Sequence, residues 1–175
     1  MTNDKENTPQ WFAIKTRAEF RSEELLAASC DEVFLPKEIV KTPNGKPRVK
    51  AAIPHVLFIK TTHYHALELE TASHADNYFP FWIYRYPNSQ EIQPIRQSNI
   101  DLLRLITSDD TSGCCIYTDE DFTPGQRVKV IGGIFKNYEG SVKRIGRNRH
   151  VVVSIEGLCF VLLPFIHPDL LQKLD

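Results

Sequence analysis

The sequence predicts an α+β fold, in which an antiparallel sheet flanked by helices is followed by a small all-β barrel. Three observations predict it. Strand-like apolar runs alternate with helical periodicity up to residue 107, an acidic break occupies 108–121, and short extended segments separated by glycines then recur about every 8–12 residues. We therefore expect a flexible tail at 1–9, an α+β domain at 10–107, a hydrated linker at 108–121 and a barrel at 122–175.

The first domain opens with a buried strand and a capped helix. The apolar run at 11–14 predicts the strand. Thr16 and Glu19 have the spacing of a capping box, in which the hydroxyl accepts from the third backbone N–H and the carboxylate reaches back to the cap. A short strand at 33–35 follows this helix, and Pro36 ends it.

An exposed hairpin comes next. Asn44-Gly45 is a strong turn signal between the arms 38–42 and 47–51, and these arms are too rich in Lys and Arg to be buried. The remaining expected elements are a core strand at 56–59, a helix at 63–75, a strand at 81–84, a helix capped by Ser98, and a short terminal helix at 169–174.

Charge is distributed unevenly along the chain. Residues 1–121 hold 13 Lys and Arg against 18 Asp and Glu, a balance of −5, whereas residues 122–175 hold 8 against 4, a balance of +4. A basic domain favours nucleic-acid phosphates or acidic protein surfaces as partners. The alternative is the solvated face of a small barrel, and charge alone does not decide between the two.

Several classes of protein are excluded by composition and motifs. No apolar run approaches the ~20 residues of a membrane span, and the polar start lacks a secretory h-region, so we expect a cytoplasmic protein with no membrane partner. The phosphate-loop, nucleophile-elbow and H-E-x-x-H motifs are missing. His63 and His65 lack further ligands at useful spacing, and Cys114-Cys115 lies in an acidic segment that raises a thiol pKa. We therefore expect no catalysis, no metal and no cofactor.

The last domain carries a recognisable motif over about 20 residues. Val128 and Val130 are expected to point inward from an alternating strand, and Gly133 to supply a positive φ. Gly140 leaves room where the second strand crosses the first, and Phe135 is expected to plug the barrel end. The motif residues are Gly125, Val128, Val130, Gly133, Phe135, Gly140 and Val142. Their spacing resembles a KOW motif, which occurs in ribosomal proteins and in NusG-type transcription elongation factors.

The first domain resembles the N-terminal (NGN) domain of NusG-type factors. It opens on an aromatic strand at 11–14 with basic residues next, and the segment 33–36 precedes a basic hairpin. The segment 53–59 resembles the family's aromatic-Pro-Gly-Tyr-Val strand, and 93–95 precedes a helix. The resemblance covers about residues 10–175, with the blocks in the family's order.

The chain departs from the family pattern at several positions. His55 stands where the family usually has Gly, Asn137 replaces another common Gly, and Ile53 and Val56 replace aromatic residues. With these substitutions the chain resembles a specialised paralogue of the RfaH or UpxY kind more than the general factor. That resemblance implies antitermination at specific operons, such as those for surface polysaccharides.

The family resemblance also implies a mechanism and partners. The NGN domain would bind the clamp helices of the large RNA polymerase subunit and suppress pausing and termination, and the factor would act as a monomer. The non-template DNA strand or nascent RNA, and a ribosomal protein or termination factor reached through the KOW-like domain, are further implied partners. The polymerase-binding candidates are Ile53, Val56, Phe58, Trp82 and Tyr84. Alternate residues of these strands must also fill the core, and that alternative fits Phe58 and Trp82 best.

The nucleic-acid candidates are Lys15, Arg17, Arg21 and Arg48. The first three flank the start of a helix, where backbone amides and the helix dipole add positive potential. A solvated helix end is the alternative interpretation. A rival function is a KOW-containing RNA-binding or ribosome-associated protein, in which the basic second domain does the binding and the first domain is an adaptor.

Overall fold

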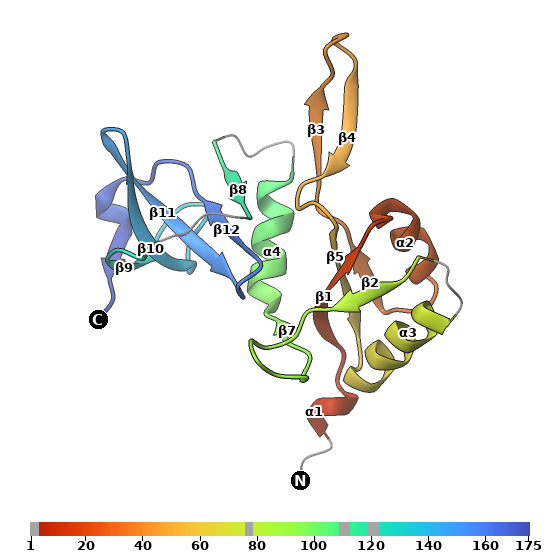
Figure 1. The fold of residues 1–175 in the computed structure, drawn as a ribbon. Helices are drawn as coiled ribbons and strands as arrows, with labels where there is room; N and C mark the ends of the chain where they lie inside the picture. The colour runs from red at the N-terminus through yellow and green to blue at the C-terminus, as the bar shows by residue number, and fades with distance from the viewer. Residues whose placement is uncertain (1–3, 76–78, 109–112, 119–122) are drawn as a thin grey trace. The chain divides into compact units, whose positions relative to one another are not determined.

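The computed structural model describes residues 4–75, 79–108, 113–118 and 123–175, and it confirms the α+β fold class (Figure 1). The chain divides into two compact units, Met1–Ile100 and Asp101–Asp175. Within the described ranges, no helix combines the length and the apolar character that crossing a membrane requires.

The first unit is built around an antiparallel sheet. Its strands follow the order β2-β5-β1-β6, and β7 also pairs with β1. A separate two-stranded hairpin, β3 with β4, extends from this sheet (Figure 1). The elements are α1 (Asp4–Asn7), β1 (Gln10–Thr16), α2 (Glu19–Leu26), β2 (Glu32–Phe34), β3 (Lys37–Lys41), β4 (Pro47–Ala51), β5 (Val56–Thr61), α3 (His63–Ala75), β6 (Phe81–Ile83), β7 (Pro94–Ile95) and α4 (Gln97–Ile106), which crosses the boundary between the units.

The core of the first unit lies between one face of the sheet and two helices. Phe12 of β1 lies opposite Ile59 of β5 in the antiparallel register, so both side chains point to the same face. They pack in one buried cluster with Leu26 of α2 and Ala66 of α3. The opposite face of β1 is buried as well, at Trp11 and Ala13, so β1 reads as a continuous apolar run and not as an alternating one.

A buried ion pair joins α3 to the end of β6. Glu70 of α3 is only 7% exposed, and its Oε1 accepts from the Ile83 backbone N–H at 2.7 Å. Arg85 donates to both carboxylate oxygens, at 3.0 and 2.7 Å. Burial by itself raises the pKa of Glu70, but the hydrogen bonds from Arg85 and Ile83 outweigh it and hold that pKa below its usual value.

After the end of α4, the second unit forms an antiparallel sheet of six strands in the order β13-β9-β10-β11-β12-β8. The alternation predicted at 127–130 is present, because Val128 and Val130 are buried while Arg127 is exposed and Lys129 is partly exposed. Its elements are β8 (Cys115–Tyr117), β9 (Arg127–Val130), β10 (Glu139–Ile145), β11 (Asn148–Ile155), β12 (Cys159–Leu162), a 3-10 turn (Pro168–Leu170) and β13 (Leu171–Lys173).

The predicted capping box at Thr16 and Glu19 is wrong. The helix α2 begins at Glu19, with Ala18 as its N-cap residue and no side-chain cap bond. Thr16 Oγ1 instead accepts from the Ala18 N–H at 3.3 Å, and Glu19 Oε1 accepts from the His55 N–H at 2.6 Å. Glu19 therefore satisfies a donor on a distant loop and not the helix start.

Three terminal or connecting segments also differ from expectation. Residues 4–7 of the predicted tail form α1. Within the predicted linker, Cys115–Tyr117 forms β8, where Ile116 lies opposite Val161 of β12. The predicted terminal helix is a 3-10 turn followed by β13, since Leu171–Lys173 pairs with β9. Each change adds backbone hydrogen bonds that sequence periodicity does not register. Residues 109–112 and 119–122, also part of the sequence predictions, lie outside the described residues.

Candidate functional site

The candidate site in the first unit lies where β1 and β6 run side by side. Lys15 of β1 is opposite Trp82 of β6 on one side and opposite Val56 of β5 on the other. Lys15 is exposed and Trp82 is 51% exposed, whereas the flanking Phe81 and Ile83 of β6 are buried, because successive side chains of a strand point to opposite faces. The register therefore brings a polymerase-binding candidate next to a nucleic-acid candidate.

Contacts from α3 hold this edge of the sheet. The His74 ring lies 5.0 Å from the Trp82 ring at a tilt of 48°, and His74 Nε2 is 2.7 Å from the Phe81 carbonyl oxygen. Ser73 Oγ accepts from the Phe81 N–H at 3.2 Å. Trp82 thus presents an exposed aromatic ring, and the contacts of α3 with the backbone of the neighbouring Phe81 hold β6 in place.

The other polymerase-binding candidates are less exposed than Trp82. Ile53, Val56 and Phe58 are buried, and Phe58 stacks on Phe34 with ring centroids 6.1 Å apart. Tyr84 is half-buried. The core interpretation was therefore right for Phe58 and wrong for Trp82, because Phe58 lies on a strand that is buried on both faces, whereas Trp82 points to the opposite face of β6 from the buried Phe81 and Ile83.

The nucleic-acid candidates fall into two places. Lys15, Arg17 and Arg21 are exposed along the end of β1 and the start of α2, and Arg21 pairs with the exposed Glu24 at 3.0 Å. Arg48 lies apart from them, on β4 of the hairpin, opposite Val40. The structure therefore groups three of the four candidates and separates the fourth.

The hairpin also carries apolar residues that the sequence analysis did not assign. Ile39 of β3 lies opposite Val49 of β4, and both side chains are exposed. The neighbouring lysines at 37, 41 and 50 were the signal in the sequence that these apolar residues are not buried. Because both side chains are exposed, this apolar pair is not part of the core.

The loop before β5 has an unusual backbone. His55 adopts a φ of +64°, in the left-handed region that favours glycine. Its N–H donates to Glu19 and its carbonyl oxygen accepts from the Thr16 N–H at 2.9 Å. Two hydrogen bonds from the end of β1 and the start of α2 thus maintain a conformation that a non-glycine residue adopts at a cost.

The motif glycines of the second unit have separate physical reasons. A Cβ on Gly140 would lie 2.4 Å from the Val152 carbonyl oxygen of β11, and one on Gly125 would lie 2.3 Å from that of Val142 on β10. Gly140 therefore makes room for β11. The sequence prediction that it makes room for the strand now labelled β9 is wrong. Gly133 has a φ of +80° with open space around it, so its role is conformational.

The remaining motif positions are mostly buried. Phe135 is buried, as are Val128 and Val130, whereas Val142 is half-buried. Asn137, at a position where the family commonly has Gly, adopts a φ of +76°. Its N–H donates to the Val130 carbonyl oxygen at 2.8 Å, which closes the loop between β9 and β10.

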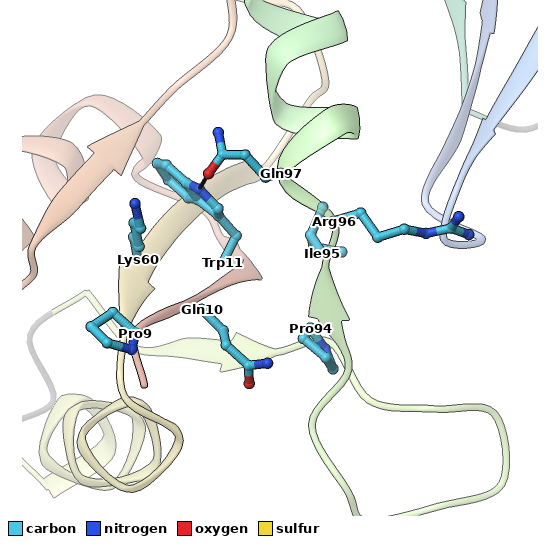
Figure 2. A pocket seen from close by; sticks show the side chains of 8 residues that line it. All are labelled: Pro9, Gln10, Trp11, Lys60, Pro94, Ile95, Arg96 and Gln97. Atoms are coloured by element: carbon cyan, nitrogen blue, oxygen red, sulfur yellow. Dashed lines mark hydrogen bonds between the residues drawn. The ribbon is translucent and has the colours of Figure 1, made fainter. Parts of the chain in front are cut away.

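A pocket of about 310 Å³ opens at the other end of β1 (Figure 2). Trp11 Nε1 donates to Gln97 Oε1 at 2.8 Å, and Lys60 Nζ lies 5.9 Å from the Trp11 ring centroid and 3.1 Å from Glu32. Arg96 extends away from Trp11 in Figure 2. These contacts join β1, β5 and the start of α4, so we assign the pocket a structural role.

The histidine and cysteine candidates have other surroundings. His63 lies edge-on to Phe12, and His65 Nε2 is 2.9 Å from the Ser29 carbonyl oxygen. In the described part of the chain, no three His, Cys, Asp or Glu side chains are grouped so as to hold a metal ion. Burial, with a smaller contribution from Cys115, raises the pKa of Cys114 to about 11, which makes it a weak nucleophile at neutral pH.

Together the two units define an α+β protein with an exposed aromatic and basic site on one unit and a six-stranded antiparallel sheet on the other. No protein-family model matches the sequence, and no curated protein sequence matches it.

Solved structures resemble this chain over almost its whole length, at low sequence identity. One, described as domain interaction in Thermotoga maritima NusG, has a TM-score of 0.46 at 15% identity and covers 96% of this chain and 98% of its own. Another, an MjSpt4:Spt5 complex, has a TM-score of 0.28 at 14% identity and covers 94% of this chain and 97% of its own.

Proposed function

We propose that this chain is a NusG-type transcription elongation factor that binds RNA polymerase noncovalently and suppresses pausing and termination. In this proposal residues 10–107 are the NGN-like domain, 122–175 the KOW-like domain and 108–121 the connection between them. The clamp helices of the large polymerase subunit are the partner of the first domain. As a specialised RfaH- or UpxY-like paralogue, the protein would act in the cytoplasm as a monomer at specific operons such as those for surface polysaccharides.

One observation carries the proposal: two residues that stand where the family pattern has Gly both adopt a left-handed backbone, which glycine favours. His55 and Asn137 replace common family glycines, and their φ values are +64° and +76°. Left-handed φ at a non-glycine residue is uncommon. These two residues lie in different units, and each stands where the family pattern has Gly. Their backbone conformations therefore support a fold like that of the family.

The exposed Trp82 is the best-supported contact to the polymerase. A helical partner needs an accessible apolar surface on a fixed backbone, and large aromatic side chains dominate the binding energy of such surfaces. Lys15 is the cross-strand neighbour of Trp82, so a partner that covers Trp82 would bring an acidic or phosphate group within reach of Lys15. The chemistry required is binding alone, which biases the polymerase away from its paused states.

The test is a binding measurement between the full chain and purified core RNA polymerase. Trp82→Ala should weaken binding by about 30-fold, the equivalent of a 2 kcal/mol contact. Tyr64→Ala is the matched control, because Tyr64 of α3 is a large aromatic residue that is 68% exposed. It should change the affinity by no more than about 2-fold. Equal losses in the two variants, or no polymerase binding by the wild-type chain, would refute the assignment.

Activity is tested by transcription in vitro on candidate leader templates. The wild-type chain should shorten pauses and increase read-through, and Trp82→Ala should reduce both effects. A template-dependent effect would support operon specificity, whereas an equal effect on all templates would support a general factor.

The rival function is supported by the charge of the second unit. A KOW-containing RNA-binding or ribosome-associated protein would use the excess of Lys and Arg in 122–175 for binding. It would bind structured RNA in the absence of polymerase, and Trp82→Ala would leave that binding unchanged. This pattern, together with failure to bind polymerase, would replace the first proposal by the second.

A further inference from the structure

The tip of the β10–β11 hairpin is a tight and defined turn. Ile145 lies opposite Asn148, which leaves Gly146 and Arg147 as a two-residue loop. Gly146 has a φ of +61°, as the first central position of a primed hairpin turn requires. The turn places Arg147 at the end of the hairpin, beyond the last paired residues of both strands.

The register next to this turn places two like charges together. Arg144 of β10 lies directly opposite Arg149 of β11, and both side chains are exposed. Like charges directly opposite each other destabilise an antiparallel pair. Arg144 Nε donates to the Gly146 carbonyl oxygen at 3.3 Å, so this guanidinium is directed toward the tip. The next pair along the hairpin, Lys143 opposite His150, adds a further basic side chain.

No acidic residue offsets these charges within the hairpin. Residues 140–155 contain three Arg and one Lys but no Asp or Glu. The nearest acids in the sequence, Glu139 and Glu156, belong to the opposite end of the two strands, and Glu139 lies 3.5 Å from Arg127. Ile145 lies six positions after Glu139 on β10, about 20 Å along the strand. The hairpin therefore concentrates positive charge at its tip.

We propose that Arg144, Arg147 and Arg149 form a binding site for the phosphate backbone of a nucleic acid. Guanidinium groups bind phosphate in a planar, two-pronged geometry, and a bound phosphate converts the repulsion between Arg144 and Arg149 into shared attraction. The arrangement reads no base edges, so it favours binding without sequence preference. This site is on the second unit and does not depend on polymerase binding through the first.

The test measures fluorescence anisotropy of labelled 20-nucleotide probes with the full chain over a range of salt concentrations. The probes are single-stranded RNA, duplex RNA, single-stranded DNA and duplex DNA, and an acidic peptide is included as a competitor. The double variant Arg144→Gln/Arg149→Gln is compared with Lys136→Gln/Lys173→Gln, which removes the same charge from exposed positions elsewhere in the second unit. The comparison between the four probes identifies which nucleic acid the site prefers.

The tip variant should bind its preferred probe at least ~10-fold more weakly than wild type, and the control should remain within about 2-fold. For single strands, its plot of log affinity against log salt should become shallower by about 1.4, since each lost phosphate contact contributes about 0.7. The tip variant should also melt at or above the wild-type temperature, because the like-charge pair is removed. That combination of weaker binding and undiminished stability is not produced by a structural defect.

Three results would overturn the assignment. They are no measurable binding of wild type to any of the four probes, equal losses in the tip and control variants, and tighter binding of the acidic peptide than of every nucleic acid. A failure of the polymerase-binding test with Trp82→Ala would not affect this result, so the two proposals can fail separately.

Discussion

The Glu70–Arg85 pair allows a quantitative prediction about the stability of the first unit. Glu70→Gln keeps the size of the side chain and one acceptor for the Ile83 N–H, but it removes the charge that faces Arg85. Breaking a buried ion pair by removing one partner costs about 3–5 kcal/mol. The Arg85 side chain is 28% exposed and regains some hydration, so we expect a loss of about 2–3 kcal/mol.

The measurement is urea unfolding followed by tryptophan emission. The two tryptophans of the chain, Trp11 and Trp82, both lie in the first unit, so this signal reports that unit specifically. Glu68→Gln is the matched control, since Glu68 is on the same helix, is exposed and lies 3.4 Å from His65 Nδ1. It should cost less than about 0.5 kcal/mol.

The stabilisation that Glu70 provides changes with pH in a predictable direction. The pKa of Glu70 is lowered in the folded state, so its stabilisation is present above the pKa of an unfolded glutamate, about 4.3, and is lost as pH falls through the folded value. The free-energy gap between wild type and Glu70→Gln should therefore be largest at neutral pH and shrink below about pH 4. A gap no larger than that of Glu68→Gln, or one that does not change with pH, would refute the reasoning.

Three further predictions concern backbone geometry and thiol chemistry. His55→Gly should be more stable than His55→Ala by about 1 kcal/mol in urea unfolding, because only glycine adopts the φ of +64° without strain, and equal stabilities would contradict this. Gly140→Ala should lower the melting temperature of the second unit, measured by circular dichroism, much more than Gly133→Ala, which costs about 1 kcal/mol. The Cβ of Ala at position 140 would meet a backbone carbonyl oxygen at 2.4 Å, whereas Gly133 has open space around it. The reverse order of melting temperatures would exclude the close approach at Gly140. Burial raises the pKa of Cys114 to about 11 and that of Cys159 to about 12. In a Cys30→Ser/Cys115→Ser variant, which removes the exposed Cys115, these two thiols should therefore react slowly with a disulfide reagent at pH 8 and rapidly in denaturant, and fast reaction of this variant in its native state would show that they are accessible.

Local signals in the sequence were sufficient for most of the elements. The Asn44-Gly45 turn predicted the β3–β4 hairpin, and the helical pattern at 63–75 has the bounds of α3. The alternation at 127–130 predicted which side chains of β9 face inward. These features depend on residues within a few positions of each other, where turn chemistry and side-chain periodicity act directly.

The candidate site was predictable only in part. Lys15 and Trp82 were identified from the family pattern, but their adjacency depends on a register between strands 67 positions apart in the sequence. The pattern could not tell Phe58 from Trp82, because both belong to apolar strands. The direction of the side chain separates them: β5 is buried on both faces, whereas Trp82 lies on the exposed face of β6, opposite the buried Phe81 and Ile83.

The sequence by itself determined the α+β class, most strand and helix positions and the glycine-dependent turns, since these follow from local propensity and periodicity. Only the tertiary structure decided the ion pair of Glu70 with Arg85, the pairing of Leu171–Lys173 with β9 and the like-charged pair of Arg144 and Arg149. Each of these depends on the register or packing of separate elements, and many alternative registers are compatible with the same local pattern until the chain is folded.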